Sequence, residues 1–312
     1  MNKRRVIKRS WIIALIAILL IGGVLYRLAD RYLIEHVEVV VADSATAAAS
    51  SGEDSTTQAV HAESDDWNYS SDDMSVSIEK VVKGSGSDQI TYYVADVQVD
   101  DATLLQSAFA DNAYGRNITE DTSDIAKDHS AIFAINGDYY GFRADGVVIR
   151  NGVLYRNEPT REGVVLYKDG TMASYDETEV SADTLLANGA LQTLSFGPAL
   201  IRNGNIVEDL DNVKIDTNFG NRGISNANPR TGIGMISANH YVFVVVDGRS
   251  DESRGMTLDE FANLFSDLGA TEAYNLDGGG SSTLYFMGRV VNNPQGKNTE
   301  RGVSDILYLG EG

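Results

Sequence analysis

Cysteine is absent from this chain of 312 residues, so its fold contains neither disulfide bonds nor thiolate metal ligands. Histidine is scarce as well, with four residues in all. Two of them, His36 and His61, precede the segment that we expect to fold. Serine–histidine catalysis and a histidine-rich zinc site are therefore disfavoured.

Basic side chains are few in comparison with acidic ones. The chain has 25 Lys and Arg against 45 Asp and Glu, which gives a formal net charge of −20. Phosphate binding along a nucleic acid needs a basic face, so we expect no nucleic-acid partner. The simplest interpretation of the excess acid is solubility.

The basic residues that do occur gather at the start of the chain. Residues 1–10 hold five of them, and the run from Trp11 to Tyr26 carries no charge. An apolar stretch of roughly 20 residues can span a bilayer, and preceding basic residues predict a cytoplasmic N-terminus. We therefore expect a cytoplasmic segment over 1–10 and a single transmembrane signal anchor over 11–29. A cleaved signal peptide begins in the same way, but no small-residue cleavage site follows closely.

A small, polar and acidic stretch follows the apolar run. Residues 42–75 are rich in Ala, Ser, Asp and Glu, a composition that buries too little apolar area to fold. We predict a disordered stalk over 30–75 and a catalytic domain over 76–312. The expected location is the cell membrane, single-pass, with this domain on the extracytoplasmic side.

The remaining sequence predicts an α+β fold, a single strand-rich domain with mixed sheets and a few packed helices. Alternating or continuous apolar runs indicate strands. One helix should begin after Thr257, which has capping-box spacing to Glu260, and end near Gly269. A second helix is expected to begin near Ser181. The predicted strands are 75–82, 90–99, 130–136, 163–167, 241–246 and 282–286.

Three apolar runs each end in a polar residue beside glycine. These turns are Asn136-Gly137-Asp138, Asp247-Gly248-Arg249, and Asp277 followed by the glycine run Gly278, Gly279 and Gly280. One Asp-Gly turn is ordinary hairpin chemistry. A run of three glycines costs folding entropy that an ordinary turn does not need. Together the three turns predict a shared cleft.

The sequence lacks the motifs of several common nucleotide and metal sites. The glycine run is not a phosphate-binding P-loop, because no Gly-Lys-Ser/Thr follows, and no dinucleotide fingerprint is present. No cofactor is required by the sequence. Abundant carboxylates leave a calcium site open, although no EF-hand spacing occurs, and no metal ligands can be assigned.

Several segments occur in an order that resembles the phosphodiester glycosidase family. They are AINGDYY, GPALIRNG, NPRTGIGM, VVVDGRS, the long segment GMTLDEFANLFSDLGATEAYNLDGGGSSTLYF, and the closing RGVSDILYL. The resemblance covers roughly residues 125–310. It implies hydrolysis of a sugar-1-phosphodiester, such as an α-N-acetylglucosamine-1-phosphodiester, in a cell-surface polysaccharide or glycan. Bacterial members are often described as exopolysaccharide-related.

This activity suggests roles for the residues of the three turns. Glycoside hydrolysis generally uses carboxylates, and Asp277 is the first candidate for nucleophile or general base. Asp247 and Arg249 are the further catalytic candidates, with Asp247 orienting Arg249 or another group. Guanidinium groups match phosphate oxygens, which gives Arg230 and Arg249 a role with the phosphate. The predicted substrate-binding residues are Arg230, Asn136, Asp138, Gly278, Gly279, Gly280, Ser281 and Ser282.

Structural roles compete with these assignments. Arg230 can form a structural ion pair, and Asp138 can cap a turn. For Tyr139 and Tyr140, core packing and sugar stacking are equally open roles.

Two other classes of function stay open. One is a phosphodiesterase that cuts the P–O bond with a carboxylate-held metal, and the other is a non-catalytic protein that binds wall polysaccharide. The sequence does not identify the sugar, the aglycone, the stereochemical course or the oligomeric state.

Overall fold

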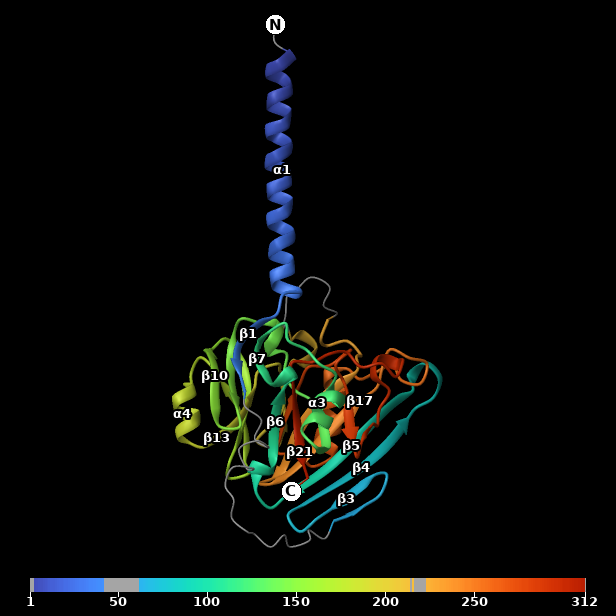
Figure 1. Cartoon of the computed structure of the whole chain (residues 1–312). Helices are drawn as coiled ribbons and strands as arrows, with labels where there is room; N and C mark the ends of the chain where they lie inside the picture. The colour runs from blue at the N-terminus through green and yellow to red at the C-terminus, as the bar shows by residue number, and fades with distance from the viewer. Residues whose placement is uncertain (1–2, 42–61, 214, 216–222, 312) are drawn as a thin grey trace.

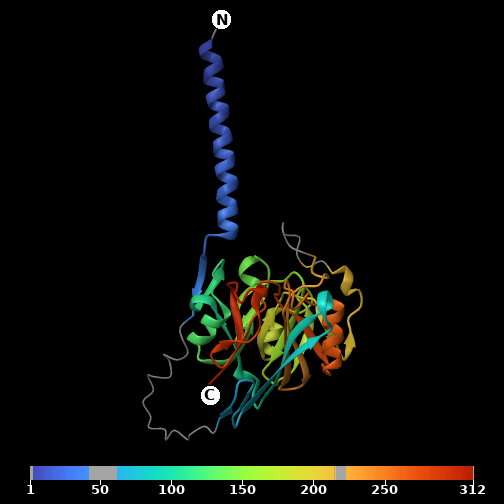
Figure 2. The same ribbon diagram turned by 90° about the vertical axis from the view of Figure 1, so that its right-hand side faces the viewer.

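The structure is a computed structural model and describes residues 3–41, 62–213, 215 and 223–311. A long helix, α1 (Lys3–Tyr32), extends away from a body of packed sheets (Figure 1). The view at a right angle shows the same separation of helix and body (Figure 2). The body is mostly sheet with few helices, which agrees with the predicted α+β class.

The largest sheet has nine strands and runs through the whole body. Its central strands, β5 and β17, carry the apolar sequences predicted for 90–99 and 241–246. In order across the sheet, the strands are β15 (Asn205–Ile206), β14 (Ala199–Arg202), β18 (Glu272–Asn275), β16 (Arg230–Ser237), β17 (His240–Val246), β5 (Ile90–Val99), β4 (Met74–Lys83), β3 (Asn68–Ser70) and β2 (Glu63–Ser64).

A five-stranded sheet packs against it, and three small sheets complete the body. The five strands in order are β20 (Arg289–Val290), β19 (Leu284–Phe286), β8 (Ala131–Asn136), β21 (Asp305–Gly310) and β6 (Leu105–Phe109). The small sheets comprise β12 (Met172–Asp176), β11 (Glu162–Tyr167) and β13 (Ala190–Leu194); β10 (Val153–Glu158) and β9 (Gly146–Arg150); and β1 (His36–Val40) and β7 (Ala113–Arg116).

The strand directions differ from the prediction of mixed sheets. Every strand pair among the described residues is antiparallel. Short connections such as that from β16 to β17 join neighbouring strands as hairpins, whereas a parallel pair needs a long crossover. The alternating sequences predicted strands correctly but carried no information about direction.

The core lies between the two large sheets. Alternate residues of β5 face opposite sides of the nine-stranded sheet, with Tyr93, Ala95 and Val97 in this core. The Phe133 ring of β8 meets the Phe243 ring of β17 with centroids 5.1 Å apart. This contact joins the two sheets directly behind the ends of the strands that carry the predicted site.

Helix α5 (Leu258–Asp267) covers the other face of the nine-stranded sheet. Thr257 and Glu260 form the predicted capping box, and Gly269 follows the helix with a φ of +83°. Phe261 and Phe265 bury fully against the sheet. The helix can approach this closely because a Cβ on Gly232 of β16 would lie 2.8 Å from the Phe261 ring. The described residues also form two shorter helices, α3 (Thr122–Asp128) and α4 (Ala182–Ala187), and Ser181 caps α4 as predicted.

Both ends of the predicted stalk differ from the structure. Residues 36–40 form β1, which pairs with β7, and residues 63–70 contain β2 and β3 at the edge of the nine-stranded sheet. Tyr69 and Met74 are buried in the main core. These segments are too short to show a sequence period, and they are ordered by pairing to the body. The middle of the stalk, residues 42–61, lies outside the described residues.

Among the residues that the structure describes, no helix has the length and apolar character needed to cross a membrane. The anchor predicted over residues 11–29 stays a prediction.

Candidate active site

The three polar turns lie at strand ends that the sheets bring together. Asn136, the last residue of β8, donates from Nδ2 to the backbone carbonyl of Asp277 at 2.7 Å. Its Oδ1 accepts from Thr231 Oγ1 of β16 at 2.7 Å. Asn136 is fully buried and thus joins the two sheets behind the turn that carries Asp277.

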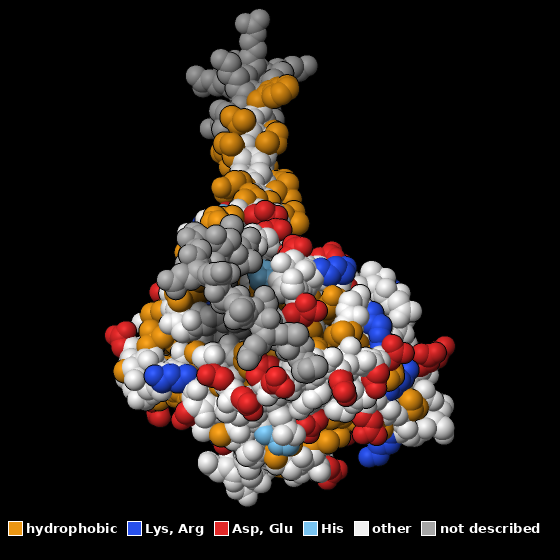
Figure 3. Space-filling model, turned by 60° about the horizontal axis from the view of Figure 1, so that its bottom comes forward, with side chains coloured by type: hydrophobic (Ala, Val, Ile, Leu, Met, Phe, Trp, Pro, Cys, Tyr) orange, Lys and Arg blue, Asp and Glu red, His pale blue; other side chains and the backbone are white. Residues whose placement is uncertain are grey.

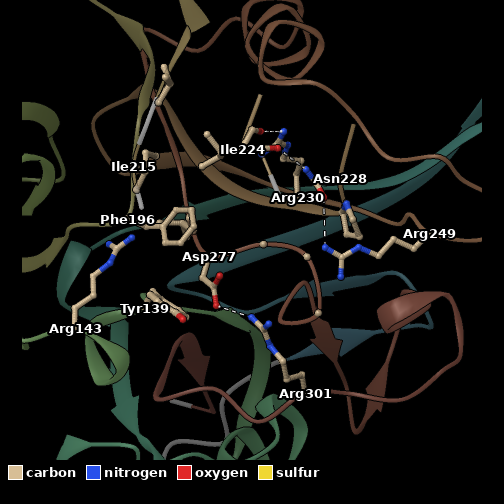
Figure 4. A pocket seen from close by; sticks show the side chains of 17 residues that line it. Tyr139, Arg143, Phe196, Ile215, Ile224, Asn228, Arg230, Arg249, Asp277 and Arg301 are labelled. Carbon is tan, nitrogen blue, oxygen red and sulfur yellow. Dashed lines mark hydrogen bonds and ion pairs between the residues drawn. The ribbon is translucent and has the colours of Figure 1, made fainter. Parts of the chain in front are cut away.

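A pocket of about 290 Å³ opens in front of this junction. Among the described residues, its wall contains one carboxylate, Asp277, and the three glycines that follow it. Tyr139 and Phe196 form an aromatic side, and Asp277 faces them across the hollow (Figure 4). The polar lining formed by the described residues also includes Asn228 and four arginines, namely Arg143, Arg230, Arg249 and Arg301.

Asp277 is 7% exposed, and its two carboxylate oxygens differ. Oδ2 accepts hydrogen bonds from Ser281 Oγ at 2.7 Å and from Arg301 Nη2 at 3.1 Å. Oδ1 has no hydrogen-bond partner among the described residues and points into the pocket (Figure 4). Burial raises the pKa of Asp277, while Arg301 and Ser281 oppose this effect. The site therefore holds one oxygen in place and leaves the other available for chemistry.

Arg301 was not among the residues predicted from the sequence. It is half-exposed, and besides Asp277 it donates from Nε to Ser281 Oγ at 3.1 Å. Arg301 begins the closing segment RGVSDILYL, so the segment was recognised without a role for its first residue. Its guanidinium keeps Asp277 oriented and keeps a positive charge at the pocket mouth.

Arg230, the first residue of β16, is 3% exposed and lines the pocket. Its guanidinium donates to three backbone carbonyls, those of Met256 at 3.0 Å, Asn226 at 2.7 Å and Ile224. No carboxylate among the described residues pairs with it, so the alternative of a structural ion pair is not what the structure contains. Burial lowers the pKa of Arg230 to about 10. A buried cation that no described carboxylate pairs with favours an anion in the pocket.

The glycine run is packed between backbone and arginine side chains. Gly279 has a φ of +65°, and a Cβ there would lie 2.9 Å from Nη2 of Arg249. A Cβ on Gly278 would lie 2.8 Å from the carbonyl oxygen of Pro229. Arg249 itself has a φ of +62° and donates to Asn228 Oδ1 at 3.3 Å. The absence of side chains from the turn therefore lets the guanidinium of Arg249 reach the pocket.

Asp138 lies near the pocket, but it does not line it. Its Oδ1 accepts from the backbone N–H of Tyr139 at 2.7 Å, and its Oδ2 accepts from that of Ser195 at 2.7 Å. Arg150 is 3.8 Å from Asp138 Oδ2 and 2.7 Å from Asp305 Oδ2, with all three side chains buried. This charged network supports the loop that presents Tyr139. Asp138 therefore occupies the turn-capping role that the sequence left open.

Asp247 is also buried away from the pocket lining. Its Oδ1 accepts from Asn292 Nδ2 at 3.0 Å and from the backbone N–H of Asn293 at 2.9 Å. Burial raises the pKa of Asp247. Its carboxylate thus holds the 292–293 segment, and Arg249 donates to Asn228 Oδ1. The role predicted for Asp247, orienting Arg249 or another catalytic group, stays a prediction.

Some of the remaining predicted residues belong to the pocket, and others are buried away from it. Ser281 Oγ donates to Oδ2 of Asp277. Ser282 is buried, and its backbone carbonyl accepts from Asn292. Tyr139 lies on the pocket wall, and Tyr140 is buried in an aromatic cluster with Phe109. Arg143 and Phe196 on the aromatic side were not predicted, since no local pattern marks them.

Metal ligation was left open by the sequence. Across the described ranges, no group of three or more His, Cys, Asp or Glu side chains is arranged to hold a metal ion. The calcium site remains an untested expectation.

With this geometry established, comparison with known proteins identifies the class. The phosphodiester glycosidase family model matches residues 129–309, which is more than half of the chain. The chain belongs to the phosphodiester glycosidase family.

Two curated relatives show how this chain resembles known proteins. The SPbeta prophage-derived uncharacterized protein YomE of Bacillus subtilis (strain 168) is 31% identical over 261 residues, covering 76% of this chain and 39% of that protein. The N-acetylglucosamine-1-phosphodiester alpha-N-acetylglucosaminidase of Bos taurus is 33% identical over 134 residues, covering 41% of this chain and 25% of that protein. The chain thus spans well under half the length of these relatives.

A solved structure shares the fold. The catalytic domain of the zebrafish N-acetylglucosamine-1-phosphodiester alpha-N-acetylglucosaminidase, auto-inhibited by its pro-peptide, matches with a TM-score of 0.61 at 23% identity. The match covers 77% of this chain and 84% of the zebrafish chain. At this identity the similarity establishes the fold of the body.

Proposed function

We propose that this protein hydrolyses a sugar-1-phosphodiester, such as an α-N-acetylglucosamine-1-phosphodiester, in a cell-surface glycan. The observation that carries the proposal is the pocket lining, in which the described residues include one carboxylate and four arginines. Ordinary glycosidases use a pair of carboxylates, one of which protonates the leaving oxygen. A phosphate leaving group needs charge neutralisation more than protonation, and arginines supply it.

Asp277 is the group that acts at the anomeric carbon. Its Oδ1 either attacks that carbon or takes a proton from the attacking water, while Oδ2 stays bound to Ser281 and Arg301. The C1–O bond breaks and its electron pair remains on the phosphate oxygen. Water supplies a hydroxyl group to C1 and a proton to the products, which are free sugar and a phosphomonoester.

The rest of the pocket positions the substrate. Arg230, Arg249 and Arg301 bind the phosphate, and the rings of Tyr139 and Phe196 offer faces for the sugar. Asn136 and Asp138 hold the backbone behind the pocket and act as positioning residues. Because Asp277 must be ionised and burial raises its pKa, the rate should increase with pH along the acid limb.

The test is hydrolysis of methyl phosphodiesters of several sugar 1-phosphates in water labelled with oxygen-18. Glycosidase action gives free sugar with the label at C1, together with unlabelled methyl phosphate. Sugar 1-phosphate with label on phosphorus, and loss of turnover in a chelator, would instead establish the phosphodiesterase alternative. Saturable binding without turnover would establish the polysaccharide-binding alternative.

The location of the body stays a prediction. It rests on the basic start of the chain and the uncharged run from Trp11 to Tyr26. Protease added to intact, wall-stripped cells should release a soluble fragment if the body is extracytoplasmic.

A further inference from the structure

A second and larger hollow adjoins the catalytic pocket. Its volume is about 870 Å³, and it lies between the C-terminal part of α1 and the body. Arg143 and Ile215 line both hollows, so the two are neighbours that share a wall. We call the second hollow the arginine groove, after five lining residues, Arg27, Arg31, Arg116, Arg143 and Arg161.

The groove is strongly cationic on a chain with a net charge of −20. Among the described residues that line it, two aspartates accompany the five arginines, and both aspartates have partners. Asp145 contacts Arg161 at 2.5 Å, and Asp30 contacts His36 at 3.2 Å. By contrast, acidic side chains are scattered over the face of the body seen in Figure 3. The positive charge is thus concentrated next to the catalytic pocket.

Hydrogen bonds fix the helix that forms one wall of the groove. Asn117 Nδ2 donates to the backbone carbonyls of Asp30 at 3.1 Å and Ile34 at 2.8 Å. The next segment, β1, then pairs with β7. Arg27 and Arg31 are four residues apart on α1 and lie on the same side of the helix.

Two of the arginines have no counter-ion in the described part of the chain. Arg27 on α1 and Arg116 at the end of β7 form no ion pair there. Arg27 lines the groove from the helix, and Arg116 lines it from the body. An anion held between them would receive charge-assisted hydrogen bonds from both.

The position of Arg143, which lines both hollows, indicates which part of a substrate would reach the groove. The guanidinium of Arg143 lies 5.1 Å from the centroids of both the Tyr139 and Phe196 rings. These rings form the aromatic side of the catalytic pocket, across from Asp277 and Arg301 (Figure 4). With the scissile phosphate beside Arg301, the sugar lies against the rings. A substituent on the far side of that sugar then extends past Arg143 into the groove.

We propose that the substrate is a polymer of sugars joined by 1-phosphodiester bonds, and that the arginine groove binds the phosphodiester next to the one being cut. This inference rests on the proposed function, because it identifies the substrate class of that site. In such a polymer each sugar carries a phosphate on both sides. The pocket takes one phosphate and its sugar, and the groove takes the second phosphate.

The kinetic test compares two kinds of substrate with the full-length protein. One is the methyl phosphodiester of α-N-acetylglucosamine 1-phosphate, and the other carries a second methyl phosphodiester on O4 or on O6 of the sugar. We expect kcat/KM to be roughly tenfold or more higher for one of the doubly substituted isomers, since hydrogen bonds to charged groups are worth this much. The advantage should shrink towards onefold in the double variant Arg27→Gln, Arg116→Gln and should decrease with added salt.

A matched control is Arg202→Gln, because Arg202 is half-exposed, pairs with Glu162 and lines neither hollow. This variant should keep the full advantage. Equal kcat/KM for the singly and both doubly substituted substrates, or an advantage that survives in the double variant, would overturn the inference. In either case, turnover of the simple phosphodiester would leave the proposed function intact.

A binding measurement separates the groove from catalysis. Calorimetry with a trimer of N-acetylglucosamine 1-phosphate units, using the Asp277→Asn protein so that no cleavage occurs, should give a Kd about tenfold weaker when Arg27→Gln and Arg116→Gln are added. Unchanged affinity would overturn the inference. The same would follow if the two arginines governed binding to phosphatidylglycerol vesicles but not to the trimer, because the groove would then be a lipid headgroup site.

Discussion

Asp277 and Asp138 each follow a buried strand and stand beside glycine, yet the structure uses them differently. Both oxygens of Asp138 accept backbone N–H groups, and the residue belongs to a buried network with Arg150 and Asp305. Asp277 keeps one oxygen open towards a pocket lined by arginines. Asp247 also lies outside the pocket lining, and its Oδ1 accepts from Asn292 and Asn293. The comparison teaches that position separates these carboxylates, since each accepts two or more hydrogen bonds but, of the three, Asp277 is the one that lines the pocket.

The largest effect is expected from Asp277→Asn. The amide retains the size of the side chain but cannot act as nucleophile or base, so kcat should fall by roughly 10³- to 10⁵-fold. Folding should persist, and the melting temperature should not decrease much, because burial raises the pKa of Asp277 and its ionised form is costly in the folded state. Steady-state rates and thermal melts at pH 7 test both statements. Near-normal turnover would show that the open oxygen has no role.

The next effect concerns stability and comes from Arg150→Met. Removing this arginine leaves Asp138 and Asp305 buried without their cation, which should cost about 3–5 kcal/mol in the free energy of unfolding at pH 7. The pKa of Asp305 is raised to about 6 by burial. A raised folded-state pKa means that the penalty exists above that value and decreases as the pH falls towards the unfolded value. Urea denaturation should therefore show a smaller loss at pH 4.5 than at pH 7, and an equal loss would contradict the role of the carboxylates.

A smaller loss is expected from Asp138→Asn. One oxygen can still accept a backbone N–H, but the amide nitrogen cannot accept the other, which leaves a buried donor unsatisfied at about 1–3 kcal/mol. The rate should fall as well, because the loop carrying Tyr139 is no longer held in place. The distinguishing measurement is the pH profile of kcat/KM. A positioning role preserves the acid limb set by Asp277, whereas disappearance of that limb would assign the base to Asp138.

The smallest effect is expected from Asp247→Asn. Both hydrogen bonds go to Oδ1, which an asparagine retains, and the substitution removes a carboxylate whose pKa burial already raises. Since a raised pKa makes the ionised form a cost at pH 7, the free energy of unfolding should stay the same or increase slightly. The decrease in kcat should remain below about tenfold, the level expected of a group outside the reacting atoms. A loss comparable to that of Asp277→Asn would place Asp247 among the catalytic residues.

Apolar patterning accounts for what the sequence predicted of the fold. The run predicted at 90–99 has the same bounds as β5, and the capping box at Thr257 begins α5. Strands β2 and β3 were missed because their order comes from pairing with β4 and from burial of Tyr69. Their few residues lack the apolar period that sequence analysis requires.

The site was only partly predictable for a related reason. The glycine run indicated that Asp277 lies at a functional site, because three consecutive glycines cost conformational entropy on folding that an ordinary turn does not require. The sequence could not tell that Asp138 points into a charged network or that Arg143 and Phe196 approach from other segments. Side-chain direction and contacts between distant segments arise only once the sheets have packed.

The glycine turn has a practical consequence for any library that diversifies this pocket. At Gly278 a new methyl group would meet the carbonyl of Pro229, a rigid neighbour, whereas at Gly279 it would meet the movable end of Arg249. Gly279→Ala should therefore shift the guanidinium at the cost of a positive φ of +65°, while Gly278→Ala should distort the chain. Randomisation is better directed at Phe196 and Ile215, which border the hollow without supporting the turn.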